Sequence, residues 1–285
     1  MRGAGAIALA VLAGFAVVRL LTVAAPDLLR APALARVNFR GAPLPTAGGL
    51  LVVLAVLVVE GGRVVLGALG VGHRADIGTA RVLVLLAVAG FGLLGLLDDV
   101  LAEGEDRGFG GHGRALLQGR ITTGLVKLVG GGALAIVLAA TPGPEGRWRL
   151  LGDAALIALA ANLGNLLDRA PGRATKCGLV AWIPVLVLAG GDRLGVAVAV
   201  VMGGFLGTFP EDLGEQLMLG DCGANVLGAV LGLAVVLEAS WHTRVIVLAV
   251  LAVLNLLSEW VSYSRVIDGV GVLRALDGLG RQRSR

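Results

Sequence analysis

The sequence predicts an all-α fold, a polytopic integral membrane bundle of about nine to ten transmembrane helices. The mean hydropathy is +0.88, and only 15% of the 285 residues are charged, against about 25% in an ordinary soluble domain. The apolar residues form runs that approach the roughly 20 residues a helix needs to cross a bilayer. These runs lack the alternation of barrel strands, so helices are the spanning structure that remains.

The candidate spans are, in chain order, 3–23, 47–69, 80–97, 122–140, 151–167, 178–190, 194–209, 222–238 and 244–263. The first could pass for a signal peptide, but it is longer than the usual apolar region of about 7–15 residues, so we interpret it as an uncleaved span. The pair 178–190 and 194–209 is short and closely joined, which leaves either two short spans or a re-entrant hairpin. We find no dividing linker and expect one transmembrane domain, 1–285.

Nine spans place the loops 24–46, 98–121, 168–177 and 210–221 and the tail 264–285 on one side. Fourteen basic residues fall on that side and eight on the other, which predicts that it is cytoplasmic. Because these loops account for most of the basic residues and aromatic residues are scarce, we expect no nucleic-acid partner. Two cysteines without a CxxC indicate neither a thiolate metal site nor a disulfide framework. The wealth of Ala, Gly, Val and Arg suggests a high-G+C bacterial genome, and hence a multi-pass protein of the bacterial inner membrane.

Four polar clusters fall on this predicted cytoplasmic side. In "NFRGAPLPTAGGL", residues 38–50, Thr46 precedes a Gly-Gly pair that opens a helix, and Arg40 is close by. Backbone N–H groups at a helix start suit a phosphate, although an ordinary loop-to-helix turn is the alternative. In "GLLDDV", Asp98 and Asp99 end an apolar run. Adjacent carboxylates at a membrane edge indicate a bound cation such as Mg²⁺, and the alternative is an acidic helix end exposed to water.

The other two clusters lie later in the chain. In "ANLGNLLDRAPGRATK", residues 161–176, Asn162, Asn165 and Asp168 are three apart and share a helical face. They indicate a polar pocket wall, and a helix C-terminal cap is the alternative. In "MLGDCGANVLG", Asp221 lies between two glycines before a span, where it caps the helix or holds a metal. Together the clusters predict a divalent cation at a cytoplasmic active site.

The order of these motifs gives a resemblance over residues 36–228. The motifs, in chain order and alternating with spans, are "NFRGAPLPTAGG", "GLLDDV", "NLGNLLD" and "LGDCGA". In this order the chain resembles the polyprenyl-phosphate N-acetylhexosamine-1-phosphate transferases, glycosyltransferase family 4. That resemblance implies transfer of a sugar-1-phosphate from a UDP-sugar to a polyprenyl phosphate for cell-envelope glycan synthesis, with release of UMP. It implies the bilayer, polyprenyl phosphate and UDP-sugar as partners and Mg²⁺ as cofactor, with Mn²⁺ as an alternative. The oligomeric state stays open, a homodimer included.

The resemblance also implies roles for individual residues. Asp98 would keep the lipid phosphate deprotonated, Asp221 would bind the metal and Asp99 would support the metal site, which makes these three the candidate catalytic residues. Asp99 and Asp221 are the candidate metal ligands. The choice of base stays open, because adjacent carboxylates titrate as a coupled pair. The candidate substrate-binding residues are Arg40, Thr46, Lys127, Asn162, Asn165 and Asp168.

Departures from the family pattern support other hypotheses. Ala102 stands where the family has lysine, Pro171 stands where its second aspartate belongs, and a late histidine-rich loop is missing. The loop before Asp221 is acidic, with Glu211, Asp212 and Glu215. One alternative is therefore a non-catalytic relative that binds a lipid phosphate or an envelope-synthesis partner. A transporter is the third hypothesis, for which Glu60 is the clear candidate for a polar residue within a span.

Overall fold

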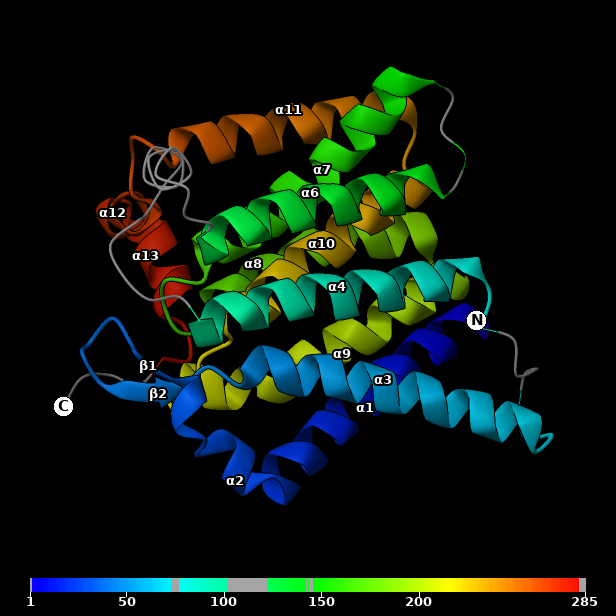
Figure 1. Cartoon of the computed structure of the whole chain (residues 1–285), viewed down its shortest axis with the longest axis horizontal. Coiled ribbons are helices and arrows are strands. Elements are labelled where there is room, and N and C mark those ends of the chain that lie inside the picture. The colour runs from blue at the N-terminus through cyan, green and yellow to red at the C-terminus, as the bar shows by residue number, and fades with distance from the viewer. Residues whose placement is uncertain (1, 73–76, 102–121, 142, 144–145, 282–285) are drawn as a thin grey trace.

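Nine long helices run between the same two ends of the molecule in the residues that the computed structural model describes, 2–72, 77–101, 122–141, 143 and 146–281 (Figure 1). They are α1 (Arg2–Ala24), α3 (Gly48–Ala68), α4 (Thr79–Leu101), α6 (Thr123–Ala140), α7 (Arg147–Leu167), α8 (Arg173–Ala189), α9 (Arg193–Leu213), α10 (Gly220–Glu238) and α11 (Trp241–Leu257). Seven of these are long and apolar enough to cross a membrane, while α8 and α11 have 17 residues each, the lower limit of about 17 for a spanning helix. The chain is a polytopic helical membrane bundle, as predicted.

Every predicted span coincides with one of these helices, but several ends differ. The spans 178–190 and 194–209, for which a re-entrant hairpin was the alternative, form two separate helices, α8 and α9. Helix α8 ends at Ala189, and Gly191 after it contacts Gly3 at the start of α1. The prediction of a span to residue 263 was wrong, because α11 ends at Leu257. Helix α4 continues past its apolar run through Asp98 and Asp99, because these carboxylates find partners inside the protein.

Helix α10 is the centre of the bundle and packs against α3, α4, α7, α8 and α9. Small residues allow this packing. A Cβ atom at Gly49 of α3 would lie 2.0 Å from the backbone nitrogen of Gly223, and one at Gly228 of α10 would lie 2.0 Å from the Ala160 carbonyl oxygen of α7. Close backbone approach of this kind is the usual way in which membrane helices gain contact area.

The segment between α1 and α3 contains more structure than a loop. It forms α2 (Pro26–Leu29), a 3₁₀ turn η1 (Pro32–Leu34) and an antiparallel hairpin of β1 (Ala35–Val37) and β2 (Pro43–Pro45), with Ala35 opposite Pro45. The two short helices α12 (Tyr263–Gly269) and α13 (Gly271–Gly278) follow α11. The hairpin, α12 and α13 all lie at one end of the bundle (Figure 1), which we call the loop end.

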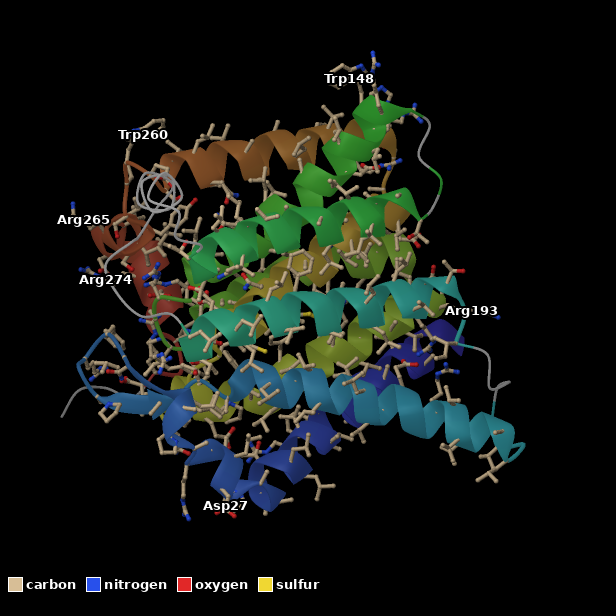
Figure 2. The ribbon with its side chains drawn as sticks, in the orientation of Figure 1. Asp27, Trp148, Arg193, Trp260, Arg265 and Arg274 are labelled. Atoms are coloured by element: carbon tan, nitrogen blue, oxygen red, sulfur yellow. The ribbon has the colours of Figure 1, made fainter. Side chains whose placement is uncertain are left out.

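The two ends of the bundle carry the features of membrane interfaces. Figure 2 shows Trp260, Arg265 and Arg274 toward the loop end, with Trp148 and Arg193 toward the other. The two tryptophans are 77% and 72% exposed, as expected for aromatic residues at the lipid–water boundary. Residues 102–121, with Ala102 and three of the basic residues counted for this side, lie outside the described residues, and the cytoplasmic orientation stays a prediction.

Glu60, the residue that favoured a transporter, is part of an ion-pair cluster. Its side chain is buried and pairs with Arg63 at 2.9 Å and with Arg81 in the first turn of α4. Ionisable residues within membrane segments usually face the interior of the bundle and pair with one another. The contacts therefore connect α3 to α4.

Candidate active site at the loop end

The second and fourth polar clusters meet at the loop end, where the last turn of α4 touches the first turn of α10. The Asp99 carboxylate accepts hydrogen bonds from the backbone N–H of Asp221 at 3.0 Å and from that of Cys222 at 2.9 Å. Gly95 makes the contact feasible, because a Cβ atom there would lie 2.3 Å from the Asp221 carbonyl oxygen. Gly220, with φ of +72°, provides the turn into α10.

Asp99 has a structural function in this arrangement. Each of its oxygens accepts from an N–H group at the α10 start, where a helix leaves donors without partners, and its side chain is buried. The residue thus acts as a helix cap supplied by another helix. Its predicted role as a metal ligand stays a prediction.

Four helices converge on the Asp221 carboxylate. Lys127 of α6 forms an ion pair with Asp221, and its Nζ lies 3.6 Å from Oδ2 of Asp98. Asn165 of α7 donates from Nδ2 to Oδ2 of Asp221 at 2.9 Å, and the Lys127 ammonium group contacts the carboxylates of both Asp98 and Asp221. Four of the predicted site residues, Asp98, Asp221, Lys127 and Asn165, are therefore brought together.

The donor set fits a magnesium ion that shares its coordination with a substrate. Mg²⁺ is usually held by one or two carboxylates, with waters and phosphate oxygens completing the sphere. Asp98 and Asp221 provide two adjacent carboxylates. Within the described residues, no three or more His, Cys, Asp or Glu side chains gather as a ready metal cage, so phosphate oxygens or waters would have to supply the remaining ligands.

The two asparagines of the third cluster contact different helices. Asn165 reaches Asp221, but Asn162 donates to Oδ1 of Asn255 in α11 at 2.7 Å. Asn162 lies one turn deeper in α7 and bonds to α11, and its predicted role in substrate binding stays a prediction. Asn255 is itself buried and donates to two carbonyl oxygens of α7 and α11, a partner that no sequence motif signalled.

Asp168 caps the end of α7 and lies beside the start of α10. The pKa of its carboxyl group is well above the usual range, because burial and the neighbouring charges of Asp212, Asp221 and Asp99 disfavour the ionised form, although the Gly220 N–H donates to it. The oxygens of a carboxyl group are able to accept hydrogen bonds from a ligand. Asp168 is therefore suited to hold a polar ligand.

A cavity of about 350 Å³ opens beside Asp168, between the β1–β2 hairpin and the segments 168–171 and 212–218. Its lining mixes apolar side chains with three carboxylic residues. The lining residues are Val37, Asn38, Phe39, Leu44, Asp168, Arg169, Ala170, Pro171, Asp212, Glu215, Leu217 and Met218. A volume near 350 Å³ is within the range of small-ligand pockets, about 300–1,000 Å³.

The first cluster is a structural turn. Thr46 Oγ1 donates to the Leu34 carbonyl at 3.0 Å, and the N–H groups of Gly48 and Gly49 donate to the carbonyls of Met218 and Leu219. These groups are engaged inside the protein, so the interpretation of this helix start as a phosphate cradle was wrong and the loop-to-helix alternative holds. The turn instead attaches α3 to the segment that precedes Asp221.

The acidic segment before Asp221, which begins in the last turn of α9, is balanced by partners that the sequence did not reveal. Glu215 pairs with Arg40 at 2.9 Å, and Glu211 pairs with Arg19 of α1 at 2.5 Å. Arg40, predicted to bind substrate, is thus held over Phe39 and Glu215 at the cavity rim. Asp212 accepts from the Gly172 N–H at 3.1 Å.

Comparison with known proteins gives one relevant similarity. No protein-family model matches the chain. The chain is similar to the phospho-N-acetylmuramoyl-pentapeptide-transferase of Deinococcus radiodurans, with 29% identity over 194 residues, which are 65% of this chain. The match spans 59% of that relative's length. This similarity supports a distant relationship to the polyprenyl-phosphate sugar-phosphate transferase family.

Proposed function

We propose that this membrane protein transfers a sugar-1-phosphate from a UDP-sugar to a polyprenyl phosphate at the cytoplasmic face, releasing UMP, for cell-envelope glycan synthesis. One observation carries the proposal: Asp98, Asp221 and Lys127 converge from three helices at the loop end of the bundle. Phosphoryl transfer requires positioning and neutralisation of charge more than covalent chemistry from the protein. The Lys127 ammonium group beside the carboxylates of Asp98 and Asp221 provides positive charge for the phosphates. The similarity to a bacterial transferase supports the same proposal.

In the proposed reaction, an oxygen of the lipid phosphate attacks the sugar-linked phosphorus of the UDP-sugar, and the bond from that phosphorus to the oxygen of the UMP phosphate breaks. Asp98 accepts the proton of the lipid phosphate, so that its oxygen is the anion that attacks. Lys127 stabilises negative charge on the phosphates, and Asn165 holds the Asp221 carboxylate in place. Mg²⁺, which Asp221 would hold, would neutralise the diphosphate, with Mn²⁺ as an alternative. The cavity beside Asp168 would take the nucleotide.

The test is release of UMP from the purified, reconstituted chain supplied with undecaprenyl phosphate, Mg²⁺ and a panel of UDP-sugars. We expect turnover with at least one sugar and a loss of about 100-fold or more in Asp221→Asn, the usual effect of removing a group that stabilises transition-state charge. Asp27→Asn is the matched control, because Asp27 is an exposed residue of α2. An Asp221→Asn variant as active as Asp27→Asn would refute the mechanism.

A non-catalytic relative is the second candidate, and the engagement of both carboxylates by Lys127 favours it. An ammonium group that already neutralises Asp98 and Asp221 lowers their affinity for a metal ion. This candidate predicts saturable binding of undecaprenyl phosphate without UMP release from any UDP-sugar. UMP release by the wild-type chain separates the two: an enzyme releases UMP with at least one UDP-sugar, whereas a binding protein shows only saturable binding of the lipid phosphate.

A further inference from the structure

The C-terminal helix α13 is attached to the bundle by polar contacts. Asp277 is the buried residue of α13, at 8% exposure, while Val272, Leu273 and Leu276 are largely exposed. Because the apolar side chains of α13 are mostly exposed, they contribute little to holding this helix against the bundle. Its position therefore depends on the polar contacts of Asp277 and its neighbours.

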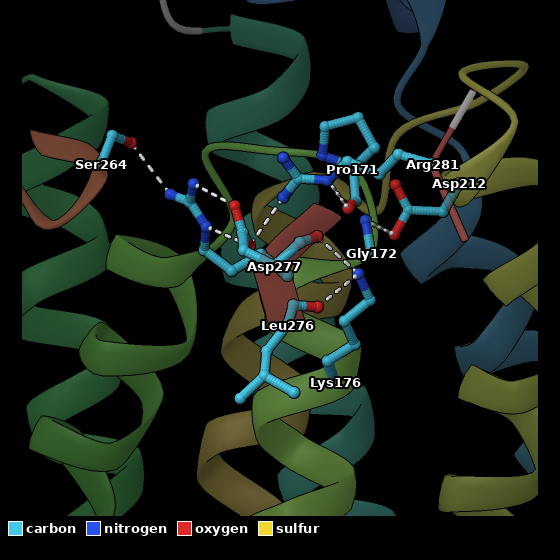
Figure 3. A network of polar contacts seen from close by, with 9 residues as sticks. Pro171, Gly172, Lys176, Asp212, Ser264, Leu276, Asp277 and Arg281 are labelled. Atoms are coloured by element: carbon cyan, nitrogen blue, oxygen red, sulfur yellow. Dashed lines mark hydrogen bonds and ion pairs between the residues drawn. The ribbon is translucent and has the colours of Figure 1, made fainter. Parts of the chain in front are cut away.

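Asp277 lies between two arginines. Arg173 in the first turn of α8 donates from Nε and from Nη2 to the two Asp277 oxygens, each at 2.9 Å, and Arg281 approaches at 2.7 Å. Lys176 donates to the Asp277 carbonyl oxygen at 2.6 Å, and Arg173 also donates to Ser264 of α12. Figure 3 shows this network, with Ser264 on one side of Asp277 and Pro171 and Arg281 on the other.

The same network reaches the turn that follows Asp168. Arg281 donates from Nε to the Pro171 carbonyl at 3.0 Å, and Gly172 donates its N–H to Asp212 at 3.1 Å from the other side. The Leu213 side chain lies against both Gly172 and Gly280. The turn 168–172 is therefore held between the tail and the end of α9, and Asp168, Arg169, Ala170 and Pro171 form one wall of the cavity.

We propose that α12 and α13 form a clamp that sets the position of the turn 168–172, with Asp277 as a positioning residue for the candidate site. Arg173 is only 3% exposed, and a buried guanidinium that loses its carboxylate is costly to keep in place. Removal of Asp277 would therefore displace Arg173 and release the turn that begins α8. The inference rests on the proposed function only for its kinetic readout.

Hydrogen exchange of the full chain in lipid nanodiscs tests the clamp without any substrate. We expect the backbone amides of residues 169, 170 and 172–176 to exchange about tenfold faster or more in Asp277→Asn, while amides of α7 and α10 keep their protection. Asp268→Asn is the control, because it removes an exposed charge from α12. Arg281→Gln, which removes the donor to Pro171, should accelerate the same amides. Unchanged exchange of 169–176 in both test variants would overturn the proposal.

Kinetics of UMP release distinguish positioning from loss of folded protein. A displaced cavity wall should raise KM for the UDP-sugar about tenfold or more in Asp277→Asn with kcat within about twofold, and Asp277→Glu should recover part of the loss. A lower kcat with unchanged KM would mean fewer folded molecules and would overturn the positioning role. If the wild-type chain releases no UMP, the proposed function fails, and the exchange experiment alone decides the clamp.

Discussion

At the scale of single residues, the two adjacent aspartates have different functions. Asp99 accepts from two backbone N–H groups of α10, whereas Asp98 faces Lys127 and Asp221. Neighbouring residues on a helix point about 100° apart, so one side chain turns toward α10 and the other toward the proposed reaction centre. Substitutions should separate stability from activity.

We expect Asp99→Ala to destabilise the protein by about 2–3 kcal/mol, because two N–H groups in a buried contact lose a charged acceptor. The melting temperature in detergent, followed by circular dichroism, measures this effect. Asp98→Ala is the paired variant and should melt close to the wild type while losing UMP release. Equal melting temperatures for the two variants would show that Asp99 does not anchor α10.

At the scale of helices, close contacts at glycines decide how the motifs meet. The start of α3 reaches α10 only because Gly49 and Gly223 have no side chains. This contact places the turn at Thr46 against the segment before Asp221. The site geometry thus depends on backbone contacts between spans.

Gly49→Ala should destabilise the bundle by about 1–3 kcal/mol, the usual cost of overpacking a filled interior. Gly132→Ala in α6 is the control, because a Cβ atom there meets nothing within 4 Å, and it should be neutral or slightly stabilising. Thermal unfolding in the same detergent compares them. A Gly49→Ala variant as stable as Gly132→Ala would contradict the proposed close contact.

The docking of α13 should depend on acid. Burial by itself raises the pKa of Asp277, but the hydrogen bonds and charge of Arg173, together with Arg281, outweigh burial and hold the pKa below its usual range. Its contribution to stability is therefore complete above the unfolded aspartate pKa of about 3.9 and is lost as pH falls through the lower folded-state value. Proteolysis of the tail at decreasing pH, with an acid-active protease, should show release of α13 below about pH 4. Asp277→Asn should release it at all pH values.

At the scale of the whole molecule, polar chemistry gathers at one end of the bundle. The aspartates, the cavity and the tail all lie at the loop end, while the Glu60 ion pairs connect α3 and α4 elsewhere. A lipid phosphate and a nucleotide would approach from the same side. The positive-inside bias predicts that this side is cytoplasmic.

Cysteine labelling measures this orientation. In a Cys177→Ser background, Phe39→Cys on the hairpin should react with a membrane-impermeant maleimide only in inside-out vesicles. Trp148→Cys at the opposite end should react in right-side-out vesicles, since both side chains are exposed. Labelling with the opposite sidedness would move the site to the outer face.

The amino-acid sequence by itself determined the approximate position of each span and the end at which the polar clusters fall. Each span follows from its own hydropathy, and alternation of spans puts every second loop on one side, so that Asp98, Asp168 and Asp221 had to share an end. That these residues gather around one cation is a separate prediction, which comes from the polar clusters taken together.

Only the tertiary structure decided which group meets which partner. Asn162 bonds to α11 and Asn165 to Asp221, Asp99 accepts N–H groups, and the acidic loop is matched by Arg19, Arg40 and the Gly172 N–H. The role of Asp277 also became visible only in the folded chain. Such pairings depend on distances of a few ångströms between helices, which arise from side-chain packing across the bundle, and hydropathy and local spacing contain no record of them.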